Sequence, residues 1–293
     1  MIALALAFTC VFCAVFSICS AVRPDTVDGG DEADSDISGD GENGDDTGNG
    51  EGSDISDSTD GENDGANTGD GNGNTDEKPD DTPKKRVAIT LDDGPHAGLQ
   101  KKFIDEMAKY GGAATFFVVG NRIETNSGSG AGLAYAVQNG WEIGIHAWTH
   151  TAYFDSCAED VYQNEVKLTS DMIKKYVPGY DIKLLRPPGG QISSSRAKAS
   201  PYAIIRWDVD TLDYNYASTA ESVQAQNVQS IVDNAMAQVR DGSIILMHEL
   251  YQNSFLAYCE ILRQLDEQGY EFVTVSELLG DKLEAGKVFN HGR

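Results

Sequence analysis

The stretch ITLDDGPH, residues 89–96, places two adjacent carboxylates directly after a short apolar run and before a Gly-Pro turn. Residues 87–91 are β-prone, and the Gly94-Pro95 pair is typical of a chain reversal. Because side chains alternate in direction along a strand, Asp92 and Asp93 at its end are expected to point to different places. The stretch therefore predicts a strand that ends in two carboxylates with different functions.

The N-terminal segment is apolar and uncharged. Residues 2–22 contain no Asp, Glu, Lys or Arg, and they end in the small-residue sequence Cys19-Ser20-Ala21. We expect residues 1–22 to be a signal peptide or, since roughly 20 apolar residues can span a bilayer, a membrane anchor. Lipidation of Cys19 is disfavoured, because the preceding Ile18 is not small. By either route the protein is expected to be extracellular or at the cell surface.

Residues 23–83 have a different composition, rich in Asp, Gly, Asn, Ser and Thr. Residues 24–83 contain 21 acidic residues and one basic residue, so they carry −20 of the chain's formal charge of −25. Such a segment cannot bury enough apolar surface to offset its ordering entropy. We expect residues 23–83 to be a disordered acidic linker.

Residues 84–293 are long enough for one sizeable domain. Their 26 acidic and 20 basic residues form no basic stripe, so nucleic acid is not an expected partner. We expect a monomer that meets the membrane only through its N-terminal segment. Two cysteines remain, Cys157 and Cys259; a buried core thiol at Cys259 and a disulfide between the two both stay open.

The pattern of the domain predicts an α/β fold. Apolar runs of strand length alternate with amphipathic stretches, as in a distorted (β/α) barrel with about seven parallel strands. An open doubly wound sheet is the alternative. The predicted strands are 86–91, 113–119, 141–145, 182–186, 203–207, 243–247 and 271–275, and the predicted helices are 97–110, 157–176, 219–239 and 254–268.

Titratable residues follow most of the predicted strands. In a parallel β/α fold the carboxyl ends of all strands open on one face, where active sites are built. We therefore expect one site that contains residues from five strands, which are Asp92, Asp93, His146, Arg186, Asp208, Asp210, Asp213 and His248.

One carboxylate and two histidines within this set predict a metal site. His146 and His150 are four residues apart, and together with Asp93 they form a suitable ligand set for a divalent ion with open positions. A bound metal makes water more acidic and polarises a carbonyl. Asp92 is then free to act as a general base.

These segments resemble the five motifs of the NodB-homology polysaccharide deacetylases, carbohydrate esterase family four, over roughly residues 86–280. The family's first motif reads T-F-D-D-G-P, and this chain has TLDDGP at residues 90–95. The resemblance implies a metal, usually Zn²⁺ with Co²⁺ or another divalent ion as alternatives, held by Asp93, His146 and His150. It further implies that Asp92 is the base and pairs with Arg186. His248 is implied to be the acid, assisted by Asp213, and Leu246 and Tyr214 to line the acetyl pocket.

The chain departs from the usual motifs at four positions. Ala147 replaces a Ser or Thr that steadies the second-motif loop, and Gly189 replaces a Tyr whose backbone N–H is the oxyanion donor. Tyr214 stands in place of Trp, and Glu249 in place of Asp after the acidic histidine. None of these changes removes a metal ligand or a proton-transfer group, and glycine keeps its N–H, so activity is expected.

Within the family, WDVDTLDY, SIILMHEL and GYEFVTVSELL most resemble peptidoglycan N-acetylglucosamine deacetylases. Removal of N-acetyl groups from peptidoglycan is therefore the expected function, with chitin, chitooligosaccharides or acetylxylan as alternative substrates. A non-catalytic sugar-binding relative is disfavoured because Asp92 and His248 are both present. A non-haem iron oxygenase is disfavoured because the chain lacks a His-x-Asp motif and an all-β pattern.

Overall fold

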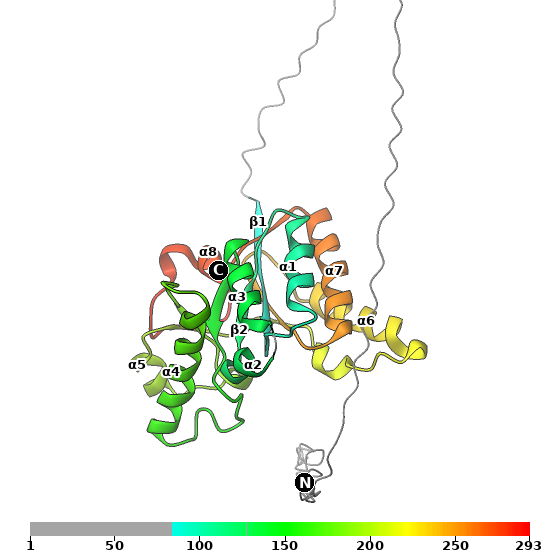
Figure 1. Ribbon diagram of the computed structural model, residues 1–293. Coiled ribbons are helices and arrows are strands. Elements are labelled where there is room, and N and C mark those ends of the chain that lie inside the picture. Colours follow the sequence, from blue (N-terminus) through cyan, green and yellow to red (C-terminus); the bar gives the residue numbers. More distant parts are fainter. Residues whose placement is uncertain (1–83, 127) are drawn as a thin grey trace, which may run out of the picture. The chain divides into compact units, whose positions relative to one another are not determined.

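A curled parallel sheet lies at the centre of the structure, a computed structural model that describes residues 84–126 and 128–293 (Figure 1). The predicted leader, residues 1–22, and the predicted linker, residues 23–83, lie outside the described residues. Within the described residues, no helix is both long enough and apolar enough to span a bilayer.

Within residues 84–126 and 128–293, nine strands form the sheet, and all of their ladders are parallel. Eight follow the order β6-β7-β1-β2-β3-β4-β5-β9, and β8 pairs with the start of β1. The strands are β1 (Lys85–Asp92), β2 (Thr115–Val118), β3 (Glu142–Ile145), β4 (Leu184–Leu185), β5 (Ala203–Ile205), β6 (Val209–Asp210), β7 (Ser243–His248), β8 (Tyr270–Phe272) and β9 (Val288–Phe289).

This strand order confirms the distorted barrel and rejects the doubly wound alternative. In a doubly wound sheet the order reverses at a switch point beside the first strand. Here β1 to β5 follow one another in sequence order, and β7 returns to the free side of β1. The barrel is not closed, because within the described residues no ladder joins β6 to β9 at the two ends of the path.

The predicted strands are close to the observed ones, with two kinds of difference. The two-residue strands β6 and β9 were not predicted, and the strand predicted at 182–186 is only two residues long, Leu184–Leu185. The strand predicted at 271–275 is wrong at its end: it stops at Phe272, and Thr274 caps the helix that follows. Thr274 and Glu277 form a reciprocal capping box, which begins a helix rather than extending a strand.

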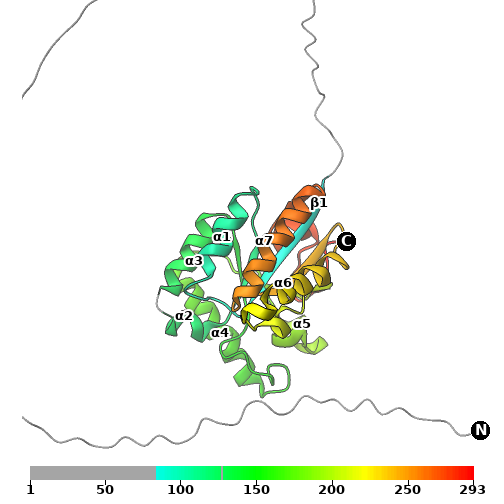
Figure 2. The same ribbon diagram turned by 90° about the vertical axis from the view of Figure 1, so that its right-hand side faces the viewer.

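Helices cover the outside of the sheet. Figure 1 shows α1 and α7 beside β1, and Figure 2 shows α6 lying next to α7. The helices are α1 (Gln100–Ala108), α2 (Gly120–Thr125), α3 (Ser129–Gln138), α4 (Glu159–Tyr176), α5 (Ser194–Ala199), α6 (Glu221–Met236), α7 (Gln252–Glu267) and α8 (Val275–Leu279), with short 3₁₀ turns at Pro188–Gly190, Asp213–Tyr216 and Gly280–Lys282. Of these, α2, α3, α5 and α8 were not predicted.

Helix α4 shows how sequence pattern sets helix packing. Its buried side chains recur at intervals of three and four residues, which places them on one face of the helix. Acidic residues occupy its first turn and lysines its last turn, in the arrangement that the helix dipole favours. The buried positions are Tyr162, Glu165, Val166, Thr169, Ser170 and Ile173. Glu165 is the one charged residue on this face.

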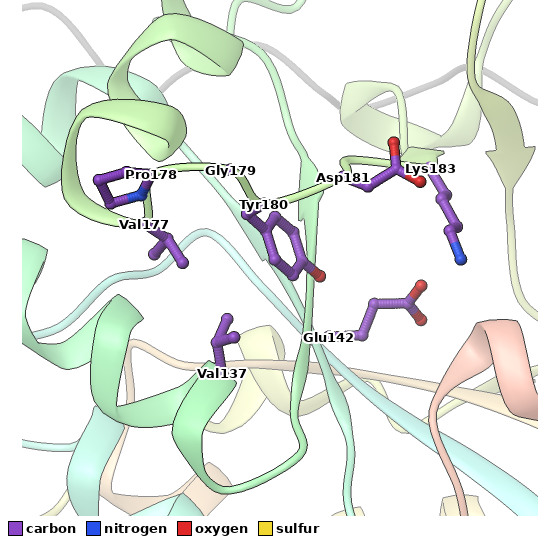
Figure 3. A pocket seen from close by; sticks show the side chains of 8 residues that line it. All are labelled: Val137, Glu142, Val177, Pro178, Gly179, Tyr180, Asp181 and Lys183. Atoms are coloured by element: carbon purple, nitrogen blue, oxygen red, sulfur yellow. The ribbon is translucent and has the colours of Figure 1, made fainter.

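The amino ends of the strands form the end of the molecule opposite the candidate site. A cavity of about 450 Å³ lies there, between the segment after α4 and the start of β3 (Figure 3). The buried Glu142 carboxylate at its edge accepts hydrogen bonds from the Ser276 N–H and from Thr115, at 3.0 and 3.2 Å. Glu142 thus attaches β3 to the start of α8, and these hydrogen bonds explain why its carboxylate is buried.

Cys157 and Cys259 are partly buried and form no disulfide within the described residues, so they are not joined to each other. Cys259 lies on α7, and burial raises the pKa of its thiol to about 11. A thiol with such a pKa is unreactive at neutral pH, which agrees with a packing role.

Candidate active site

Asp92 is the last residue of β1, and its carboxylate is buried against an arginine. Arg186, which follows β4, is fully buried and donates from Nη1 to Asp92 Oδ1 at 2.7 Å. The same guanidinium donates to Thr90 Oγ1 and to the carbonyl of Arg206, at 2.7 and 3.0 Å. Burial raises the pKa of Asp92 above its usual range, and the charges of Arg186 and His248 oppose that rise.

His248 is the last residue of β7 and pairs in register with Asp92 on β1. Its Nδ1 lies 2.7 Å from Asp213 Oδ1, and its backbone N–H donates to Asp213 Oδ2 at 2.8 Å. Ser254 Oγ also donates to that fully buried carboxylate, at 2.5 Å. Burial by itself lowers the pKa of His248, but the hydrogen bond and charge of Asp213, helped by Asp92 and Asp93, raise it to about 9.

Asp93 directly follows β1 and has a left-handed backbone conformation, with φ of 70°. Asp93 Oδ1 lies 3.1 Å from His150 Nε2 and 3.5 Å from His146 Nε2. The two aspartates therefore have different principal partners, as expected, but Asp93 lies beyond the end of β1 in a left-handed conformation, so alternation along a strand does not account for the difference. His146 lies between them, because its Nε2 is also 3.6 Å from Asp92 Oδ2.

The predicted metal ligands Asp93, His146 and His150 are brought together, with one donor atom of each lying within 4.8 Å of the others. Asp93 Oδ1 is buried and has no hydrogen-bond partner among the described residues, so it is a ligand atom that a cation would satisfy. His146 Nδ1 lies 2.7 Å from the carbonyl of Arg186, which fixes the proton on Nδ1 and leaves Nε2 as a ligand atom. Burial lowers the pKa of His146 to about 3, so this imidazole is neutral. The donor set fits a divalent ion.

The loop between the two histidines is held by Glu165, which the sequence analysis missed. Glu165 Oε2 accepts from the backbone N–H groups of Trp148 and Thr149, both at 2.8 Å, and Oε1 accepts from Thr149 Oγ1 at 2.7 Å. Ala147 and His150 in this loop have positive φ values of 70° and 53°. Glu165 thus steadies the loop that was expected to lose a hydrogen bond at Ala147. The signal was present in the sequence: a glutamate in register with the buried face of an amphipathic helix.

The three predicted substrate-binding residues occupy different surroundings. Gly189 is exposed in the turn after β4, with φ of 64°, and a Cβ there would meet no atom within 4 Å. Tyr214 is 41% exposed, and its ring lies edge-on to His248 with 5.5 Å between centroids. Leu246 is buried on β7, two residues before His248.

The remaining acidic residues after β5 have structural partners. Asp208 accepts from the Ile244 N–H at 2.8 Å and pairs with Arg293 Nη2 at 2.5 Å. Asp210 Oδ1 accepts from the Leu212 N–H at 2.9 Å. Of the three aspartates expected in this part of the site, only Asp213 contacts His248.

Comparisons with known proteins identify the family of this chain. The family model for polysaccharide deacetylase matches residues 79–203. The peptidoglycan-N-acetylglucosamine deacetylase PgdA of Listeria monocytogenes is 31% identical over 70% of this chain and 41% of its own length. The peptidoglycan-N-acetylmuramic acid deacetylase PdaC of Bacillus subtilis is 34% identical over 68% of this chain and 39% of its own length. The chain thus spans about two fifths of these relatives.

Two further similarities extend over most of the matched protein. A peptidoglycan-N-acetylglucosamine deacetylase of Bacillus cereus is 31% identical over 67% of this chain and 89% of its own length. A family 4 acetyl xylan esterase from Clostridium thermocellum, solved in complex with a cobalt ion, is 29% identical and superposes with a TM-score of 0.62, over 71% of this chain and 98% of that one. The chain therefore belongs to the polysaccharide deacetylase family.

Proposed function

We propose that the protein is a metal-dependent hydrolase that removes N-acetyl groups from a polysaccharide, and that its substrate is N-acetylglucosamine in peptidoglycan. The observation that carries the proposal is the meeting of three groups at the carboxyl ends of the strands. These groups are the Asp92–Arg186 pair, the His248–Asp213 pair and the donor set of Asp93 with two histidines. Amide hydrolysis needs a base, an acid and an electrophilic catalyst. The first two groups would supply the base and the acid, and a metal held by the third group would supply the electrophilic catalyst.

Asp93, His146 and His150 would hold the metal, with Zn²⁺ or Co²⁺ as the proposed ion. When bound, a divalent ion polarises the acetamide carbonyl and makes a nearby water more acidic. Asp92 then accepts a proton from the attacking water. Arg186 holds the Asp92 carboxylate in one orientation through Oδ1, which leaves Oδ2 on the side of His146.

His248 donates the proton that the leaving amine requires. A pKa of about 9 keeps this imidazole cationic near neutral pH, so it is in the acid form when the carbon–nitrogen bond breaks. Asp213 binds Nδ1 and thereby leaves Nε2 to face the substrate. The Gly189 N–H is the proposed oxyanion donor, with Leu246 and Tyr214 lining the acetyl group.

Two features bear on the glycan. The relatives from Listeria monocytogenes and Bacillus cereus are named as peptidoglycan-N-acetylglucosamine deacetylases, which supports the cell wall as substrate. The open space at Gly189 and the 34% identity to an N-acetylmuramic acid deacetylase support a second candidate, a sugar that carries a bulky substituent. Chitooligosaccharides and acetylxylan are the comparison substrates, the latter because an acetyl xylan esterase shares the fold.

The proposed location is the cell surface. Residues 1–22 would direct export or anchor the chain, and the acidic residues 23–83 would separate the domain from the membrane. As a flexible coil, about 60 residues span roughly 40–45 Å. Such a linker suits an immobile wall glycan more than a diffusing metabolite.

Acetate release from a panel of glycans tests the proposal. Purified protein is incubated with peptidoglycan, chitooligosaccharides and acetylxylan, before and after chelation and after Zn²⁺ or Co²⁺ is added back. We expect release from peptidoglycan that chelation abolishes and metal restores. Full activity in a verified metal-free preparation would overturn the metal dependence, and much faster release from acetylxylan than from peptidoglycan would overturn the substrate assignment.

A further inference from the structure

The turn from Asp93 to His96 carries a metal ligand in a costly backbone conformation. A non-glycine residue in the left-handed region costs about 1–2 kcal/mol, so surrounding contacts must hold Asp93 there. Two such contacts come from the region of α2. Arg122 Nη1 donates to the carbonyl of Asp93, and Asn126 Nδ2 donates to the carbonyl of Pro95 at 2.9 Å.

Glu249 contacts the same turn from the other side of β1. It directly follows β7, whereas α2 follows β2. Its side chain is fully buried, and Oε1 accepts a hydrogen bond from the His96 N–H at 2.6 Å. Its own backbone N–H donates to the carbonyl of Asp92 at 3.0 Å. In the part of the chain that the structure describes, no group hydrogen-bonds to the buried Glu249 Oε2, which is costly for a carboxyl group. No step of the proposed reaction uses this residue.

The unpartnered oxygen lies where a side chain at position 94 would be. A Cβ on Gly94 would lie 1.8 Å from Glu249 Oε2 and 2.6 Å from its carboxyl carbon, far inside contact distance. Gly94 and Glu249 are therefore complementary in size. The glutamate supports the turn at its middle by packing and at its end by the hydrogen bond to His96.

We propose that Glu249 is a positioning residue for the metal ligand Asp93, an inference that rests on the proposed function. Only Gly94 and Pro95 separate Asp93 from the His96 N–H that Glu249 binds. Without the support of Glu249, the turn relaxes and Asp93 Oδ1 no longer faces His146 and His150 in the geometry that a metal needs. Groups that orient a metal ligand typically change metal affinity by about 10- to 100-fold when they are removed.

Metal affinity of the full chain, measured without any substrate, tests this role. Zn²⁺ affinity is obtained by competition with a chromogenic chelator, and the visible absorption of the Co²⁺ form reports the coordination geometry. We expect Glu249→Ala to weaken Zn²⁺ binding by about 10- to 100-fold and to change the Co²⁺ spectrum. Glu249→Gln should bind nearly as the parent does, because its amide oxygen still accepts from the His96 N–H.

A double-mutant cycle tests the packing. Gly94→Ala alone should weaken metal binding, because its Cβ pushes the Glu249 carboxyl away. Adding Gly94→Ala to Glu249→Ala should cost little more, since the clash is gone. Glu142→Ala is the matched control: it removes a buried glutamate about 13 Å away along β3 from His146, and should lower thermal stability while leaving metal affinity unchanged.

The possible outcomes distinguish failure of the positioning role, of the size complementarity and of the proposed function. Unchanged Zn²⁺ affinity in Glu249→Ala, or equal losses in a folded Glu249→Gln and Glu249→Ala, would overturn the positioning role. Losses that simply add in the cycle would overturn the size complementarity. If the parent protein binds neither Zn²⁺ nor Co²⁺, the proposed function itself fails, and the inference fails with it.

Discussion

Asp213 is predicted to set the pH at which the proposed acid loses its proton. The difference between the pKa of about 9 for His248 and the ordinary 6.5 corresponds to about 3 kcal/mol of preferential stabilisation of the imidazolium. Asp213→Asn keeps the shape of the side chain and removes its charge. Burial, which lowers the pKa of His248, is then opposed only by Asp92 and Asp93. We expect the pKa to fall to about 6.5 or lower.

The consequence for rate depends strongly on pH. At pH 8 the protonated fraction of His248 falls from roughly 0.9 to roughly 0.03 when the pKa drops from about 9 to about 6.5, a loss of about 30-fold. At pH 6 the same change removes less than about a third of the protonated form. The Asp213→Asn variant should therefore be nearly normal at pH 6 and severely impaired at pH 8.

Two measurements check this prediction. Acetate release from chitooligosaccharide between pH 5 and 10 gives the alkaline limb of the rate profile, and NMR of the imidazole gives the His248 pKa directly. The parent protein and the Asp213→Asn variant are compared at the same metal content, because a bound cation lowers the pKa of His248 in both. Ser254→Ala is the control, since it removes one hydrogen bond to Asp213 but keeps the charge. An alkaline limb that stays in place in Asp213→Asn would refute the reasoning.

Three further predictions concern individual residues. Asp92→Asn should keep metal and lose turnover by about 10²–10⁴, as expected for a general base; loss of metal, measured by elemental analysis, would mean that the two aspartates are assigned the wrong way round. Gly189→Ala should lower the free energy of unfolding by about 1 kcal/mol because φ is 64°, and Gly189→Asn should lower it by less. Both variants should keep kcat, since the backbone N–H remains, and a large loss of kcat in the Asn variant would contradict this. Glu165→Ala should weaken metal binding by loosening the His146–His150 loop, and a chelator titration that matches the parent would refute that role.

The sequence predicted most of the site because its residues follow strands. Asp92 and His248 are each preceded by a continuous apolar run, and parallel strands bring their carboxyl ends to one face whatever the loops do. The contacts between those residues, such as Arg186 with Asp92, came instead from the family resemblance. Periodicity fixes the face on which a side chain lies but not its partner.

What the sequence did not predict depends on long-range contacts. The periodicity of α4 indicates that Glu165 is buried but not that it binds the loop after β3, and Glu249 binds His96 across 153 residues, so neither partner is evident from local sequence. Strand β9 consists of two residues whose partners are on β5, and only its hydrogen-bonded pairing with β5 defines it as a strand. The left-handed conformations of Asp93 and His150 could not be predicted from the sequence either. Non-glycine residues adopt such conformations only when tertiary contacts require it.

Asp92 and His248 are opposite each other on hydrogen-bonded strands, so main-chain geometry fixes the separation of the proposed base and acid. Strand spacing is nearly constant at about 4.8 Å, and a register can change only by whole residues, which would turn one of the two side chains to the other face. Gly189 and Tyr214, by contrast, lie in turns outside the ladder. Substitutions in these turns can therefore change the glycan that is bound while the proposed proton-transfer pair stays in place. Directed evolution toward a new glycan should accumulate its substitutions in the turns.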